Sequence, residues 1–259
     1  MIHKRFTILA AFALIISGTQ AQYNIISGGH LTANTMNKGK WECGVFQPLR
    51  IGISERMEFN SSAFLFPLLP NAGLKVSWKA IENTSFATEH SLSIPSVFLN
   101  TFSRKGIGGL LSPEFDFPFM ASTQHSLLIS RVMSDSAIVN LRAGFAWTYR
   151  TGDVDPLATI DLPLFYPRMA NYYEAVSLRA GISCLYPIAK RWMLEEGFQV
   201  FILTRNQHNF FFENSGSVSW RIKRSFRLKA GYNLSYGSYP FGNHWQLWPS
   251  IDILFGSRK

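Results

Sequence analysis

An unbroken alternation of apolar and polar residues from Phe226 to Tyr236 constrains the fold of this chain most strongly. Successive side chains of a β-strand point to opposite faces, so the alternation predicts one long strand with an apolar face and a polar, basic face. A strand of a soluble sandwich usually runs about five or six residues, whereas a strand that crosses a membrane needs about 9–11. The length therefore fits a membrane barrel, and a soluble barrel with long strands fits it as well.

The N-terminus predicts export from the cytoplasm. A basic start, Met1–Arg5, precedes an apolar run, Phe6–Ile16, and a small-residue cleavage pattern that ends at Ala21. These are the regions of a secretory signal peptide, and the apolar run is too short to span a membrane as a helix. We expect three segments: a signal peptide at 1–21, a leader at 22–39 and a barrel at 40–259.

The composition favours a protein whose surface is solvated by lipid. Charged residues make up 16% of the chain, against roughly 25% in ordinary soluble domains, while aromatic residues make up 15%. After the signal peptide no apolar stretch reaches the length of about 18 residues that a membrane-spanning helix requires, so spanning strands are expected instead. The net charge of +9 comes without a compact Lys/Arg run or a nucleic-acid-binding motif, so we expect no nucleic acid partner.

Short and long connections alternate along the chain. Short polar turns between alternating runs are expected near 54–56, 81–85, 134–136, 189–191 and 223–225. Longer irregular loops are expected at 100–113, 151–172, 205–210 and 237–244. Outer-membrane barrels have this asymmetry, with short periplasmic turns and longer outer loops. We therefore predict an all-β, antiparallel, up-and-down transmembrane barrel in the outer membrane. It has twelve strands within a range of ten to fourteen, and the least certain strand lies in 22–40 or 113–122.

The tryptophans indicate which face of the strands meets lipid. In the alternating runs, Trp78, Trp192 and Trp220 lie near short turns, and Trp147 and Trp245 lie near long loops. This spacing matches two aromatic girdles at the membrane interfaces. The opposite faces carry small residues, glycines and charges, as the lining of a lumen does. A soluble barrel with an apolar interior would show the same alternation with inside and outside exchanged.

The strand positions predicted to face inward carry more basic than acidic residues. The lumen-lining candidates are Lys75, Lys79, Arg142, Arg179, Glu195, Glu213, Arg221, Arg227, Lys229 and Asp252. They predict a small channel or transporter with a basic lumen, whose partners are the lipid bilayer and small anionic solutes. Two alternatives stay open. The charges could pair in a lumen filled with side chains, or the barrel could be a scaffold for a surface interaction through the long loops. The oligomeric state is left open.

Two histidine–serine neighbours raise the possibility of a lipid-modifying enzyme, but their positions in the strands exclude a catalytic pair. His90 precedes Ser91 and His125 precedes Ser126, but adjacent residues of a strand face opposite sides and cannot form a nucleophile–base pair. No metal-binding spacing is present, and we expect no enzyme activity and no cofactor. Cys43 and Cys184 are expected to be small apolar side chains rather than a disulfide.

The segment from Gly39 to Phe46, followed by Pro48–Glu58, resembles uncharacterised outer-membrane barrels of Bacteroidota. It is also similar to the opening hairpin of transporter-like barrels named after a phenol-degradation pathway. A glutamine at the mature start, Gln22 here, is common in exported proteins of Bacteroidota. The resemblance covers about twenty residues and implies a hairpin within a barrel. It implies no catalytic residues.

Overall fold

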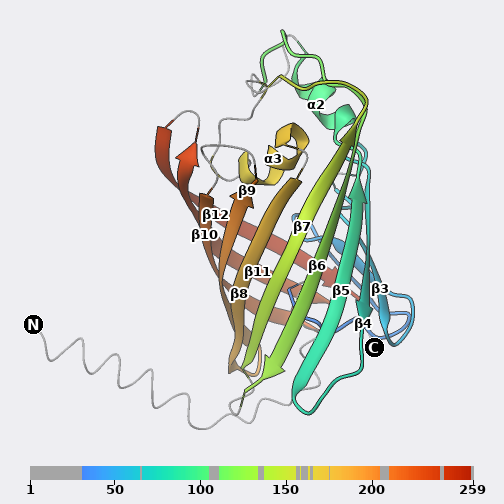
Figure 1. Ribbon diagram of the computed structural model, residues 1–259. Helices are drawn as coiled ribbons and strands as arrows, with labels where there is room; N and C mark the ends of the chain where they lie inside the picture. Colours follow the sequence, from blue (N-terminus) through green and yellow to red (C-terminus); the bar gives the residue numbers. More distant parts are fainter. Residues whose placement is uncertain are drawn as a thin grey trace, which may run out of the picture.

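The described part of the chain forms a β-barrel with two helices at one end (Figure 1). The computed structural model describes residues 31–64, 66–104, 111–133, 137–155, 158, 163, 166–174, 176–204, 210–239 and 242–257. The predicted signal peptide, part of the leader and the turn at 134–136 lie outside these residues. The strands are β1 (Trp41–Gly44), β2 (Leu49–Gly52), β3 (Met57–Ser61), β4 (Asn71–Ser77), β5 (Thr84–Ser93), β6 (Met120–Val132), β7 (Ile138–Arg150), β8 (Val176–Ala189), β9 (Trp192–Leu203), β10 (Phe210–Lys223), β11 (Phe226–Tyr239) and β12 (Gly242–Gly256).

The sheet closes on itself with up-and-down topology. Each strand pairs antiparallel with its neighbour in sequence, and β12 pairs with β1 through Glu42 opposite Gly256 and Gly44 opposite Leu254. The prediction of a twelve-stranded antiparallel barrel is confirmed. Among the described residues of 22–40 there is no strand, and 113–122 contributes only the start of β6.

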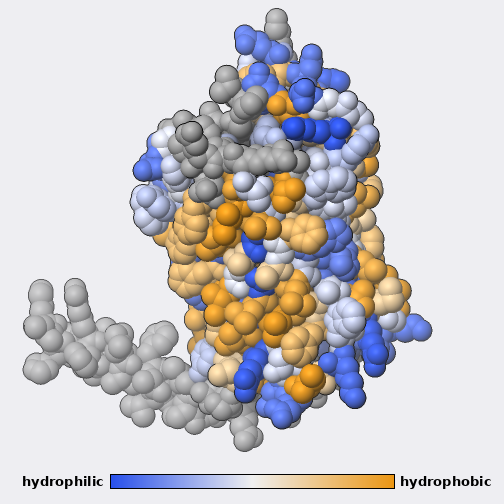
Figure 2. Space-filling model, in the orientation of Figure 1, coloured by the Kyte–Doolittle hydropathy of each residue, from blue (hydrophilic) through white to orange (hydrophobic). Residues whose placement is uncertain are grey.

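The apolar parity of the strands faces outward. On β7 the apolar residues Leu141 and Phe145 are 47% and 45% exposed, whereas the polar residues Asn140 and Thr148 are 2% and 3% exposed. The other long strands also expose large apolar side chains, and Figure 2 shows many hydrophobic residues across the middle of the face in view, with hydrophilic residues gathered toward its two ends. The tryptophans near both ends, such as Trp220 and Trp245, are also exposed on this outer face.

The wall is uneven in height. Strands β1 to β4 are four to seven residues long, and β6 to β12 are twelve to fifteen. Only the last residues of β12 pair with β1. The backbone N–H of Ser257 donates to the carbonyl of Trp41, and the backbone N–H of Val45 donates to the carbonyl of Ile253. The backbone groups of odd-numbered residues in and just after β12 therefore face the β1 side. The N–H that Pro249 lacks would therefore point to an edge without a paired strand in the described chain, which explains why proline is tolerated in β12.

Two expected features differ in the structure. The predicted loop at 237–244 is mostly strand, because β11 extends to Tyr239 and β12 begins at Gly242. The strand expected to include Lys79 ends at Ser77, so Lys79 lies beyond β4 and is exposed.

In the part of the chain that the structure describes, two helices lie at or next to the long loops, where the sequence predicted no helix. They are α2 (Ser96–Phe102) and α3 (Tyr166–Glu174). Among the described residues, neither helix is long and apolar enough to cross a membrane. Buried apolar side chains join the helices and loops into an outer cap, formed by Leu99, Leu111, Phe117, Met120, Val154, Ala158 and Met169.

Candidate functional site: the barrel interior beneath helix α3

Helix α3 lies across the interior at the long-loop end of the barrel. Its Asn171 side chain donates to the hydroxyls of Ser122 on β6, at 2.6 Å, and Thr148 on β7, at 2.8 Å. On the other side its Arg168 forms a bidentate ion pair with Glu213 on β10. Because β6 and β10 are not neighbours in the sheet, the helix bridges different parts of the wall.

Aromatic packing and backbone bonds fix the two ends of α3. At its start, Tyr166 packs against Phe211 and Tyr239 with ring centroids 5.5 and 5.7 Å apart. At its end, Arg150 of β7 donates to the backbone carbonyls of Tyr173, at 2.9 Å, and Tyr172. A cation at the C-terminal carbonyls also complements the helix dipole. The helix therefore closes this end of the interior with a defined set of contacts.

The chain before β1 fills the interior at the short-turn end. The backbone N–H of Ala33 donates to Ser130 on β6 at 2.7 Å, and that of Met36 donates to the carboxylate of Glu58 on β3 at 2.8 Å. Lys75 donates to the carbonyl of Thr32 at 3.1 Å. Strands β3, β4 and β6 hold this segment against the inner face of the barrel, and we call it the plug, defined as residues 31–36.

A buried charge cluster supports the plug. Arg50 forms a bidentate ion pair with Glu58, at 2.8 and 2.7 Å, and Lys75 lies 3.7 Å from the same carboxylate. All three residues are at most 2% exposed. A buried charge is tolerated only when it is paired and hydrogen-bonded, and Glu58 is the residue that links the cluster to the plug.

Between α3 and the plug lies an interior cavity of about 110 Å³. Its lining comes from five strands and the helix: Ser91, Ser93, Ser122, Gln124, Ala146, Pro167, Arg168, Asn171, Tyr172, Ser177, Arg179 and Phe201. Most of these groups are hydroxyls, amides or guanidinium groups, so the cavity is polar. Burial raises the pKa of Tyr172 to about 12, against the opposing effect of a hydrogen bond with Ser93. The phenol is therefore neutral at physiological pH.

Arg179 reaches this cavity across a glycine. It is paired in register with Gly144 on β7, which in turn is paired with Ser126 on β6. The guanidinium passes over Gly144 and donates to the Ser126 hydroxyl at 2.9 Å. A Cβ atom at position 144 would lie 2.6 Å from that hydroxyl and 2.4 Å from the carbonyl of His125. Glycine is therefore required for the close approach.

The remaining predicted residues divide between two parts of the barrel. Arg142 pairs with Glu89 at 2.5 Å near Arg179. Toward the short turns, Arg227 pairs with Glu42 at 3.3 Å and Lys229 with Glu195 at 2.9 Å. Both pairs line a second interior cavity of about 20 Å³.

Two predicted residues bind backbone groups instead. Asp252 accepts hydrogen bonds from the backbone N–H groups of Val45, Phe46 and Gln47 and so holds the β1–β2 turn. Arg221 donates to the carbonyl of Lys190 in a neighbouring short turn.

Several interior residues were not among the predicted lumen-lining residues, although strand parity indicates them. Glu58 on β3 and Glu89 on β5 both belong to the inward parity of their strands, but β3 has only five residues, so its alternation is a weak signal. Asn171 could not have been found this way, because it lies on a helix that the sequence did not predict.

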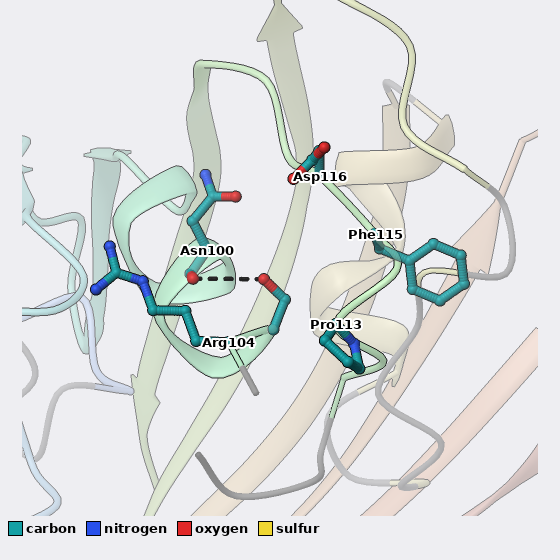
Figure 3. Close-up of a pocket in the computed structure, with 6 residues that line it drawn as sticks. Asn100, Arg104, Pro113, Phe115 and Asp116 are labelled. Atoms are coloured by element: carbon teal, nitrogen blue, oxygen red, sulfur yellow. Dashed lines mark hydrogen bonds between the residues drawn. The ribbon is translucent and has the colours of Figure 1, made fainter. Parts of the chain in front are cut away.

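A second hollow lies in the outer cap, away from the interior (Figure 3). It measures about 400 Å³ and is lined by Asn100, Ser103, Arg104, Pro113, Phe115 and Asp116. Figure 3 shows α2 on one side and the segment 113–116 on the other, with the hydroxyl of Ser103 bonded to the carbonyl of Asn100.

The histidine–serine neighbours do not form a catalytic pair. His90 and His125 contact each other on the outer face, with their Nδ1 atoms 2.7 Å apart. Ser126 faces inward and binds Arg179. The predicted separation of these side chains is confirmed. Cys43 and Cys184 are both free thiols.

Comparisons with known proteins found no matching family model and no matching curated protein. Solved outer-membrane barrels are similar at low identity. The NanC porin matches with a TM-score of 0.47 and 10% identity, over 84% of this chain and 96% of the porin. OmpT of Vibrio cholerae, in a variant that lacks loop L8, matches with a TM-score of 0.42 and 11% identity. The match covers 86% of this chain and 60% of that OmpT chain. The CymD monoaromatic hydrocarbon channel matches with a TM-score of 0.37 and 9% identity, over 86% of this chain and 90% of the channel. These low scores carry no argument about function, and the Bacteroidota resemblance stays a prediction.

Proposed function

We propose that this protein is an outer-membrane barrel that lets small anionic solutes pass through a lumen gated by α3. The observation that carries the proposal is the division of the strands into an apolar outer face and a polar, basic inner face. A soluble protein rarely exposes a contiguous apolar band, whereas lipid solvates such a band. The predicted signal peptide and the sorting of short turns from long loops support the same location.

The first expected result concerns location. The mature chain should be recovered only with detergent from the outer-membrane fraction. Unheated samples should migrate differently from boiled samples on a denaturing gel, because closed barrels resist unfolding by detergent. Differential extraction followed by gel electrophoresis measures both properties. Recovery of a soluble periplasmic monomer would refute the membrane location.

The interior charges support a preference for anions. The ion pairs of Arg142, Arg227 and Lys229 neutralise these residues. Arg179 binds a hydroxyl and Arg221 binds a carbonyl, and neither forms an ion pair within the described chain. Asp252 also lies outside any ion pair of the described residues, so these three groups together leave an excess of positive charge, and a positive field concentrates anions.

The second expected result concerns the gate. Asn171→Ala removes two hydrogen bonds from α3, while Ser122 and Thr148 keep their own bond at 3.1 Å. With a net value of about 1 kcal/mol for each bond, the open population should rise roughly tenfold or more. The wild type should conduct little in planar bilayers. The variant should open more often, with a reversal potential on the anion side in a salt gradient.

The matched control for this experiment is Asn100→Ala. It also removes two hydrogen bonds, those with Phe117, but in the outer cap. Its conductance should equal that of the wild type. Equal increases in both variants would point to general loosening, and a cation-selective current would refute the anion preference.

A second candidate function rests on the outer cap. The groove of Figure 3 is open to the outside and combines Arg104, Asp116 and Phe115 on a packed apolar base. Such a groove favours a surface interaction. Loss of ligand binding to whole cells after Phe115→Ala, with conductance unchanged, would support this alternative.

A further inference from the structure

We propose that the cavity beneath α3 is a binding site for a small oxyanion, a phosphate or a short carboxylate, held by Arg179. The proposal deepens the proposed function, because it names the class of solute and the place where that solute pauses. It does not require conduction, since an interior site can be occupied in a barrel that stays closed.

The charge of Arg179 is the first argument. An arginine side chain in a protein stays protonated. Within the described chain Arg179 forms no ion pair, and the neighbouring acids are already engaged: Glu89 pairs with Arg142 and Glu213 pairs with Arg168. Three guanidinium groups therefore share two carboxylates in this part of the interior. A charge removed from water without a counter-charge is costly, and an anion in the adjacent cavity would supply the counter-charge.

Unused hydrogen-bond donors are the second argument. The Nε atoms of both Arg179 and Arg142 are buried without an acceptor. Buried polar groups in folded proteins are nearly always bonded, so the Nε of Arg179, a residue that lines the cavity, calls for a missing partner. An oxyanion offers several acceptor oxygens and can take bonds from a guanidinium group in two directions.

The lining of the cavity is the third argument. Hydroxyls of Ser91, Ser93 and Ser177 and the neutral phenol of Tyr172 surround the space. These groups can donate to an anion without adding charge. The volume of about 110 Å³ corresponds to about three or four molecules of liquid water, which suits an ion of a few heavy atoms and excludes a lipid headgroup with its chains.

The experiment measures binding on the refolded full-length mature protein in detergent. Inorganic phosphate and acetate are titrated by calorimetry, with chloride at equal ionic strength as the reference. The wild type should bind phosphate or acetate, and chloride should not reproduce the heat. Arg179→Gln keeps a donor for Ser126 but removes the charge, and it should weaken binding at least tenfold.

Two further variants make the result decisive. Ala146→Leu should fill the cavity without changing any charge and should also abolish binding, so it replaces Arg179→Gln if that variant does not refold. Arg221→Gln removes a basic residue near the short turns, outside the cavity, and should bind as the wild type does. Full binding by Arg179→Gln or Ala146→Leu, or equal loss in Arg221→Gln, would overturn the site.

The same proteins separate this site from the proposed function. Anion binding that depends on Arg179, without any conductance in the Asn171→Ala variant, would support the site and refute passage. Anion-selective conductance without binding in the cavity would support passage and refute the site. Absence of any saturable binding by phosphate or acetate would overturn the site in its own right.

Discussion

Glu58→Gln is expected to lower the free energy of unfolding by about 3–5 kcal/mol, the range found when one partner of a buried ion pair is removed. The glutamine has nearly the same shape as the glutamate, so packing changes little. What changes is the charge: Arg50 and Lys75 stay buried while the carboxylate that both contact is lost. The backbone N–H of Met36 also loses a charged acceptor. Denaturant unfolding in lipid vesicles measures the effect.

The control is Glu195→Gln, which breaks the ion pair with Lys229. The side chains of this pair are 19% and 17% exposed, and they line the small interior cavity. Water and mobility reduce the value of such a pair, so the expected loss is about 1 kcal/mol. A loss for Glu58→Gln no larger than that for Glu195→Gln would show that the buried cluster is not what stabilises the short-turn end.

The strands could be predicted because each has one face toward lipid and one toward the barrel interior, and the alternation of apolar and polar residues reports both faces. Lipid requires apolar side chains on one face, and a polar interior requires the other face to be small or charged. This contrast is strong in β7, where Leu141 and Arg142 alternate, and it persists over the full length of the long strands. It is weak in β1 to β3, where four or five residues give too few repeats to fix a strand boundary.

Helix α3 could not be predicted because it is only nine residues long and lies in a proline-containing segment that the sequence predicted to be an irregular loop. Its sequence, Tyr-Pro-Arg-Met-Ala-Asn-Tyr-Tyr-Glu, places polar side chains toward a polar interior. Arg168 and Asn171 attach the helix through an ion pair and hydrogen bonds rather than through a hydrophobic face. Its buried apolar residues, Tyr166 and Met169, are too few to set a helical period apart from the surrounding loop.

The alternation along each strand predicts which charged residues face inward, but it does not predict which of them form ion pairs. Arg142 on β7 binds Glu89 on β5, and the strand β6 lies between them. Such contacts depend on how the strands tilt and how far long side chains extend over small neighbours. Gly144 shows the same limit, because its role beneath Arg179 follows from the register of three strands. Parity alone therefore could not predict the position of the site.

The outward face can be tested with one substitution at two depths. Ala143 lies at the centre of β7 on the outer face, is exposed, and is paired in register with Leu127, which is 46% exposed. Ala143→Arg would place a guanidinium group against the hydrocarbon core. At the bilayer midplane this substitution costs a barrel about 2–4 kcal/mol. We expect a loss of that size in the free energy of unfolding measured in phospholipid vesicles.

Ala121→Arg is the matched control, because it makes the same change on the same face near the long-loop end. Ala121 is the second residue of β6 and is paired with Tyr149, an exposed aromatic residue of the outer girdle. Near the interface an arginine costs only about 0–1 kcal/mol, since its head group reaches water. A depth-dependent difference between the two variants requires a membrane on this face. Equal and small losses would mean that water, and not lipid, surrounds the barrel.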